Sequence, residues 1–215
     1  MGEQEKIKIF DDNKNLIGVA SRSDVHKLGY WHEVFHCWFI SNEGGVDYIY
    51  LQLRSKNKKD YPNLLDITAA GHLLADETVE DGVREIKEEI GIDVAFEELI
   101  KLGVIDYCVV QEDFIDKERA NVFLYKNENT FHDFTLQVEE VAGIVKAKLI
   151  DFSQLWFGEK DEIEINGFQI NDDGIRQSMK EIVSKDKFVP HQVSFYKEVI
   201  QKINEYVVNP KGCMR

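Results

Sequence analysis

The sequence predicts an α/β (α+β) fold in which strands precede and follow one short amphipathic helix. Runs rich in β-branched and aromatic residues, the types enriched in strands, occur on both sides of the helical segment. The helical segment, residues 78–91, carries apolar residues at a helical spacing. With 215 residues, of which 43% are hydrophobic, the chain can bury a core without the help of disulfides.

Three strands are predicted before this helix and three after it. The first three are KIKIF (6–10), EVFHCWFIS (33–41) and VDYIYLQLRS (46–55), and NEGG (42–45) is a hairpin turn between the last two. The later three are LIKLGVIDYCVV (99–110), ERANVFLYK (118–126) and GIVKAKLI (143–150), followed by a short helix, SQLWF (153–157). These elements are expected to form one main domain, residues 1–158.

Residues 159–215 are predicted to be a helical extension packed on the same domain. DDGIRQSMKEIVSK (172–185) and HQVSFYKEVIQKINEYV (191–207) are interpreted as helices, separated by a break near Pro190. The second helix has an apolar face made of Val193, Tyr196, Val199, Ile200 and Ile203. Packing against the main domain is the simplest use of this face, and a homodimer or other partner interface is the alternative.

The segment 78–91 has the signals of a helix of about three turns. Its apolar residues recur at spacings of four, three and four, so they fall within a narrow arc that should pack on a core: Val79, Val83, Ile86 and Ile90. Thr78 followed three residues later by Asp81 resembles a capping box, and Gly91 suits the C-terminal end.

Three carboxylates, Glu85, Glu88 and Glu89, lie roughly opposite this apolar stripe. Carboxylates at i and i+4 repel each other by roughly a few tenths of a kcal/mol, and glutamate near a helix C-terminus opposes the helix dipole. A bound cation removes that cost, and hard Mg²⁺ or Mn²⁺ prefers oxygen ligands that it often shares with substrate phosphates. The alternative is a solvated helix face on which Arg84 pairs with Glu88.

The segment AGHLLADETVEDGVREIKEEIGI (70–92) resembles the Nudix box, GX5EX7REUXEEXGU, in which U is aliphatic. The second half, from Arg84 to Ile92, fits without a mismatch. The first half is one residue short: counting from Gly71 gives Glu77 as the upstream acid, whereas counting back from Arg84 gives Ala70 and Asp76. The resemblance predicts a Nudix-type α/β/α sandwich around a mixed sheet.

Roughly residues 6–157 are similar to the Nudix branch close to type I isopentenyl-diphosphate isomerase, which also contains isomerase-like plant hydrolases. Three segments carry this resemblance: IFDDNKNLIGVASRSDVHKLGYWHEVFHCWFI, LQLRSKNKKDYPNLLDITAAGH and FTLQVEEVAGI. Five residues match metal ligands of the isomerase: His26, His32, His72, Asp116 and Glu118. Asp116 and Glu118 alternate on a predicted strand and should face the same side. Whether His26, His32, Asp116 and Glu118 form a second metal site is left open.

The resemblance implies a hydrolase dependent on Mg²⁺ or Mn²⁺ that cleaves a diphosphate linkage in a nucleotide-like small molecule. Glu85 and Glu89 would be the main metal ligands, with Glu88 as a ligand or base, and Arg84 would orient the glutamates. The backbone carbonyl of Ala70 is expected to add a ligand. The expected further ligand from a later loop is Glu140, chosen over Glu139, although both also fit a solvated loop.

Four residues are assigned to the substrate: Arg54, Lys58, His72 and Glu118. Arg54 and Lys58 match positions that hold phosphate in relatives, since arginine grips phosphate with two donors and lysine acts as a point charge. A basic cluster at the edge of a hairpin is the alternative interpretation of these two residues.

Two other functions compete with hydrolysis. The isomerase carries a catalytic cysteine directly before the glycine and histidine that match Gly71 and His72, and this chain has Ala70 there, which cannot donate a proton. The isomerase also has a degenerate box helix, whereas this chain keeps its glutamates. A non-catalytic Nudix-type ligand-binding protein is the other alternative, suggested by the shortened loop.

Charge and cysteine content narrow the function classes further. A net charge of −14 disfavours binding to a nucleic-acid polymer, which needs a surplus of lysine and arginine. The three cysteines, Cys37, Cys108 and Cys213, are odd in number and widely separated, which favours a reducing compartment. The sequence has no run of 18 apolar residues and no signal-peptide pattern, so no membrane association and a cytoplasmic location are expected.

Overall fold

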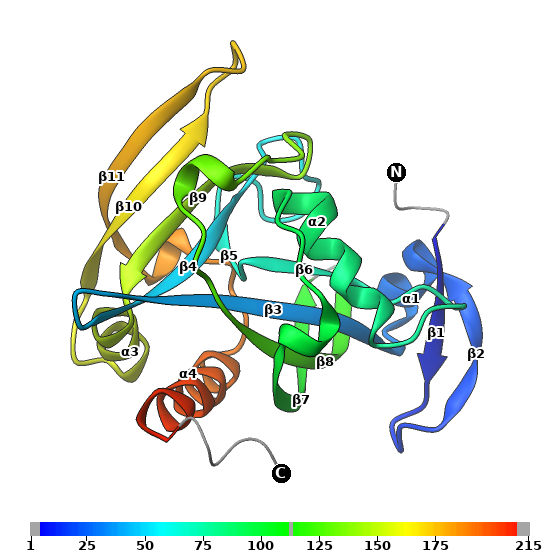
Figure 1. Cartoon of the computed structure of the whole chain (residues 1–215). Helices are drawn as coiled ribbons and strands as arrows, with labels where there is room; N and C mark the ends of the chain where they lie inside the picture. Colours follow the sequence, from blue (N-terminus) through cyan, green and yellow to red (C-terminus); the bar gives the residue numbers. More distant parts are fainter. Residues whose placement is uncertain (1–4, 112–113, 210–215) are drawn as a thin grey trace.

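The computed structural model describes residues 5–111 and 114–209 (Figure 1). Strand β3 (Trp31–Glu43) is the axis of the sheet. Along one side, β8 (Phe114–Lys126) pairs with it in parallel. Along the other side, β1 (Lys6–Phe10), β6 (Ala69–His72) and β4 (Val46–Arg54) pair with it in turn, all antiparallel. The sheet is therefore mixed, as predicted.

The remaining strands extend the sheet in both directions. The main path runs β11-β10-β9-β4-β3-β1-β2, while β7 continues the sheet beyond β8 and β5 pairs with β4. The bounds of these strands are Leu16–Ser21 (β2), Leu65–Asp66 (β5), Ile100–Gln111 (β7), Val141–Lys148 (β9), Glu162–Ile170 (β10) and Arg176–Ser184 (β11). Strands β3 and β4 pair only near their hairpin, so they separate where β5 and β6 enter.

Four α-helices and four short 3-10 turns complete the described part of the chain. The helices are α1 (Arg22–Leu28), α2 (Arg84–Ile90), α3 (Leu149–Phe157) and α4 (Val193–Val208). The 3-10 turns span Asp81–Val83, Phe96–Glu98, Phe131–Asp133 and Lys185–Lys187. None of the helices formed by the described residues is long and apolar enough to cross a membrane.

Alternate residues of β3 supply two hydrophobic cores, one on each face of the sheet. Val34, Trp38 and Ile40 belong to a core that also contains residues of α3 and α4. Phe35 and Phe39, on the opposite face, belong to a core that contains residues of α2. This alternation is the period-two pattern of a strand buried on both faces. Figure 1 shows α2 on the other side of β3 from α3 and α4, which confirms the predicted α/β/α sandwich.

The C-terminal helix α4 packs against α3 and shares its hydrophobic core. The rings of Tyr196 and Trp156 are stacked with centroids 3.6 Å apart and planes at 9°. Val199, Ile200 and Ile203 are fully buried, whereas Val193, also assigned to the apolar face, is 48% exposed. The buried face therefore begins at Phe195 and Tyr196, late in the first turn of the helix.

The prediction of a helix over residues 172–185 is wrong, because β10 and β11 form an antiparallel hairpin there. Asp172 to Gly174 form the turn, with Gly174 in the left-handed region at φ 74°. Met179 and Val183 are the buried residues of β11. A spacing of four fits one face of a helix and also one face of a strand, so the sequence pattern could not separate the two.

Helix α1 and strand β2 were not predicted. The Oγ of Ser21 accepts a hydrogen bond from the backbone N–H of Asp24 at 3.2 Å and caps α1, and Gly29 ends the helix at φ 68°. The helix has only seven residues, and Val25 and His26 are its buried positions. Two buried positions are too few to give a periodic sequence signal.

The packing of α2 leads to a prediction about stability. Ile86 is fully buried in the core between α2 and the sheet. Ile86→Ala should lower the free energy of unfolding by about 2–5 kcal/mol, because it removes buried methyl groups and leaves a cavity. Lys87→Ala, on the exposed face, should change the free energy of unfolding by less than about 0.5 kcal/mol. Urea denaturation of both variants measures the difference, and equal effects would contradict this orientation of the helix.

Candidate active site

A cavity of about 580 Å³ opens where β3 and β4 separate. The cavity is lined by residues of α1, α2, β3, β6 and β8. Residues of the loop after β4 and of the segment before α4 also line it. A second cavity, of about 680 Å³, lies near the β3–β4 hairpin and the end of α4, and none of the predicted site residues lines it. The smaller cavity is therefore the candidate site, since its lining carries the predicted chemistry.

Glu85 reaches the cavity because Gly71 has no side chain. A Cβ on Gly71 would lie 2.1 Å from the carboxyl carbon of Glu85, far closer than atoms can approach. The glycine of β6 therefore allows the helix carboxylate to approach the strand backbone. Gly71 and Glu85, which are 14 positions apart in the sequence of the box, are therefore in direct contact in the structure.

Glu89 lies one turn further along α2 and is buried. Its Oε2 accepts hydrogen bonds from the backbone N–H of Ala70 at 3.0 Å and from the side-chain amide of Gln52 at 3.3 Å. Burial, together with the charge of Glu85, raises the pKa of Glu89 to about 8. Burial likewise raises the pKa of Glu85 to about 7, although Arg84 opposes the change. Two largely buried carboxylates one helical turn apart favour a shared cation.

Arg84 binds the upstream acid of the box and identifies it. Its Nε and Nη2 donate hydrogen bonds to the two oxygens of Glu77 at 2.5 and 2.9 Å, and Nη1 donates to Glu85 at 2.7 Å. Asp76 is exposed, whereas only 14% of the Glu77 side chain is exposed. Glu77 is therefore the upstream acid, and the missing residue falls between it and Arg84. A 3-10 turn, Asp81–Val83, leads into α2 in this shortened stretch.

Glu88 and Glu140 lie at the rim of the cavity. Glu88 accepts a hydrogen bond from Arg84 at 3.0 Å, and 55% of its side chain is exposed. Glu140 forms an ion pair with Lys58, while Glu139 is exposed and does not line the cavity. The structure thus favours the choice of Glu140 over Glu139, and the ion pair fixes where Lys58 lies.

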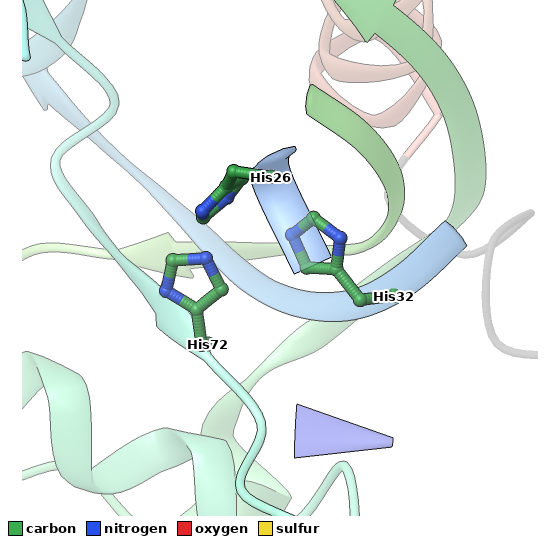
Figure 2. A group of neighbouring side chains, drawn as sticks. All are labelled: His26, His32 and His72. Atoms are coloured by element: carbon green, nitrogen blue, oxygen red, sulfur yellow. The ribbon is translucent and has the colours of Figure 1, made fainter. Parts of the chain in front are cut away.

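Figure 2 shows three histidines from separate elements converging on one point: His26 of α1, His32 of β3 and His72 of β6. One ring nitrogen of each lies within 4.8 Å of the others. The same limit encloses nitrogen and oxygen atoms of His32, Asp116 and Glu118. Burial lowers the pKa of His32 to about 4 and lowers that of His72 well below its usual value. Both rings are therefore neutral, which is the form that binds metals.

The donor atoms of this cluster fit a divalent cation. The Nε2 atoms of His32 and His72 and the Oδ1 of Asp116 are buried and make no hydrogen bond. Buried polar atoms are rarely left unpaired, and each one needs an explanation. Imidazole nitrogens with carboxylate oxygens are a ligand set typical of transition metals, including Mn²⁺.

Arg54, assigned to substrate phosphate, is already engaged within the protein. Its Nη1 donates to Asp66 Oδ2 at 2.8 Å, and its Nε and Nη2 donate to the backbone carbonyl of Asp60 at 3.3 and 2.9 Å. Burial alone would raise the pKa of Asp66, but His191 and Arg54 hold it well below its usual range. Arg54 therefore anchors a buried carboxylate at the wall of the cavity.

Several lining residues were missed by the sequence interpretation: Arg22, His36, Asp66 and His191. They come from four separate parts of the chain, and no local spacing connects them. One signal was present: the chain has only six histidines, and five of them, all except His132, gather at this cavity. Histidine is a frequent ligand and acid–base group, so such convergence indicates a functional site.

Comparisons with known proteins agree with this fold. No known protein-family model matches the chain. The chain is 39% identical over 206 residues to an "uncharacterized Nudix hydrolase" of Clostridium acetobutylicum, a match that covers 94% of this chain and 98% of the relative. The crystal structure of a MutT/nudix family protein from Enterococcus faecalis superposes with a TM-score of 0.51 at 12% identity, covering 84% of this chain and 63% of the other.

The chain belongs to the Nudix hydrolase family, because the Clostridium relative matches it over nearly its whole length. The predicted relationship to the isomerase branch is also confirmed. An isopentenyl-diphosphate Δ-isomerase of Mycolicibacterium vanbaalenii is 29% identical over 126 residues, which is 58% of this chain and 62% of the relative.

The contact between Gly71 and Glu85 can be tested by adding one methyl group. Gly71→Ala should displace the flexible carboxylate of Glu85 at little cost to folding, since only the end of a side chain must move. We expect Mn²⁺ affinity, measured by electron paramagnetic resonance, to fall by at least about 10-fold, as in other metal sites whose ligands lose their orientation. Ala70→Gly, which removes a methyl group from the neighbouring residue, is the control. Equal Mn²⁺ affinity in Gly71→Ala and the native protein would contradict the role of the glycine.

The raised pKa values of Glu85 and Glu89 predict how metal and pH act on stability. From about pH 4.5 to about pH 8, the unfolded chain releases protons that the metal-free folded protein retains, so stability without metal should fall as pH rises. A dication binds the ionised carboxylates, so stabilisation by Mg²⁺ should grow over the same range.

At a Mg²⁺ concentration 100-fold above its Kd and at pH 8, Tm should rise by roughly 5–10 °C relative to protein in EDTA. At pH 5 the rise should be much smaller. Differential scanning fluorimetry measures both values, and a rise that is equal at the two pH values would contradict the assignment of these carboxylates as ligands.

Proposed function

We propose that the protein is a hydrolase, dependent on Mg²⁺ or Mn²⁺, that cleaves the diphosphate linkage of a nucleotide-like small molecule. The observation that carries this proposal is the pair of buried carboxylates, Glu85 and Glu89, placed beside the backbone of Gly71 and Ala70. A divalent cation at this site supplies charge neutralisation for the diphosphate and a lowered pKa for a water molecule. Hydrolysis needs both effects.

The residues around the two carboxylates have complementary roles in this proposal. Arg84 holds Glu77, Glu85 and Glu88 in fixed positions through a single guanidinium. Glu88, at the exposed rim, is placed to take a proton from water. The backbone carbonyl of Ala70 and the carboxylate of Glu140 would add oxygen ligands to a bound cation.

The same proposal assigns the diphosphate to the basic side of the cavity. Lys58, paired with Glu140, is the lysine that lines it and can exchange a carboxylate for a phosphate oxygen. Arg54, held by Asp66, keeps the opposite wall in place. His26, His32 and His72, with Asp116 and Glu118, are proposed to hold a second divalent cation, on the strength of their convergence and of the unpaired atoms of His32, His72 and Asp116.

The histidine cluster is also the observation that favours isopentenyl-diphosphate isomerase chemistry, because it reproduces an isomerase-like ligand set. Ala70 argues against that chemistry. It lines the cavity where the isomerase carries its cysteine, and a methyl group neither donates nor accepts a proton. A ligand-binding protein without activity would not need the buried glutamates of α2, whose burial costs stability.

A substrate screen tests the proposal. Nucleoside di- and triphosphates, nucleotide sugars, dinucleotides and isopentenyl diphosphate are incubated with Mg²⁺ or Mn²⁺, and phosphate, nucleoside monophosphate and dimethylallyl diphosphate are measured. We expect metal-dependent hydrolysis that falls at least about 100-fold in Glu89→Gln, which removes a ligand charge. Glu139→Gln, a neighbouring exposed carboxylate outside the cavity, should retain native activity.

Two results would reject hydrolysis as the function. Conversion of isopentenyl to dimethylallyl diphosphate would establish the isomerase instead. Tight binding of a diphosphate without turnover of any compound in the panel would establish a ligand-binding protein.

A further inference from the structure

The segment between the β10–β11 hairpin and α4 carries a histidine into the candidate site. Val189 and His191 line the cavity together with Asp66 of β5. The backbone N–H of Val189 donates to the carbonyl of Leu65 at 2.9 Å, and its carbonyl accepts a hydrogen bond from the hydroxyl of Tyr196 at 2.8 Å. The segment is thus tied to β5 on one side and to α4 on the other.

The ring of His191 is held in one orientation. Its Nε2 lies 3.0 Å from Asp66 Oδ1, and the other oxygen of Asp66 is bound by Arg54. The rings of Tyr107 and Phe195 lie 5.2 Å from it, the first edge-to-face and the second tilted. Because an ionised carboxylate only accepts hydrogen bonds, Nε2 must carry the proton of this contact. The ring nitrogen that remains for a ligand is Nδ1.

The balance of charged residues around the cavity indicates which ligand group the Nδ1 of His191 can bind. Ten carboxylates line the cavity, against four lysine and arginine side chains. Three of those four, Arg54, Lys58 and Arg84, already have carboxylate partners. A diphosphate brings further negative charge, so its oxygens need donors that the cavity wall still has free. His191 can supply one, since Asp66 contacts only its Nε2 and an imidazolium donates from both ring nitrogens.

We propose that His191 is a substrate-binding residue whose Nδ1 donates a hydrogen bond to a phosphate oxygen of the diphosphate, on the wall formed by β5 and the segment before α4. This inference rests on the proposed function and adds to it a binding residue outside the box and outside the main strands. The orientation of the ring by Asp66 before binding limits the entropy lost when the contact forms.

Two substitutions at this position separate binding from structure. The side-chain amide of glutamine lies near the position of Nε2, so His191→Gln keeps a contact with Asp66 and lacks a group at Nδ1. The amide of asparagine lies near the position of Nδ1, so His191→Asn keeps a donor for phosphate and lacks the contact with Asp66. His132→Gln, which alters the exposed histidine outside the cavity, is the matched control.

Binding of methylenediphosphonate, a non-hydrolysable diphosphate, is measured by calorimetry in the presence of Mg²⁺. We expect His191→Gln to bind roughly 10- to 100-fold more weakly than the native protein, the loss typical of one hydrogen bond to a charged group. Its Tm should stay near the native value, and His191→Asn should recover part of the affinity. With a hydrolysed substrate, KM should rise in His191→Gln while kcat stays within about threefold of the native value.

Native affinity in His191→Gln would overturn the proposal while leaving the hydrolase intact. Equal losses of affinity in His191→Gln and His191→Asn, each with a lowered Tm, would show a structural role for the ring and would also overturn it. If the native protein neither binds the diphosphonate nor hydrolyses any diphosphate, the proposed function fails and this inference fails with it.

Discussion

The site depends on the burial of two carboxylates, Glu85 and Glu89, in the space that opens where β3 and β4 separate. Burial of such charges is costly unless a partner compensates. The protein places Arg84 beside the first and a backbone N–H of β6 beside the second. The raised pKa values that remain mean that these contacts do not compensate fully. Several residues of the box therefore act together to compensate the charge of these two carboxylates.

Much of this arrangement could be predicted because local spacing carries it. The apolar seam of α2 follows from helical periodicity, and the fit from Arg84 to Ile92 comes from the resemblance to the Nudix box. The contact of Gly71 with Glu85 was not predicted and is a finding of the structure. The identity of the upstream acid was not decidable in the same way. Sequence counting gave Glu77 and Asp76 equal standing, and only the burial of Glu77 against Arg84 distinguishes them.

The other side of the cavity could not be predicted, because it is built by contacts between segments far apart in the chain. His191 meets Asp66 through the pairing of residues 65 and 188, which leaves no periodic signal. The failure over residues 172–185 has a different cause. Two buried residues four apart satisfy both helical and strand periodicity, and the exposed edge strand β11 offers no third buried residue to decide between them.

The parallel pairing of β3 with β8 has a kinetic consequence. It aligns His32 with Glu118 and so brings together ligands from two strands distant in sequence. Contacts between distant segments form after local ones during folding, because closing a long loop costs entropy before the contact stabilises the chain. The histidine cluster is therefore expected to assemble after the local structure has formed. An ion bound there would then slow unfolding of the native protein more than it would speed its folding.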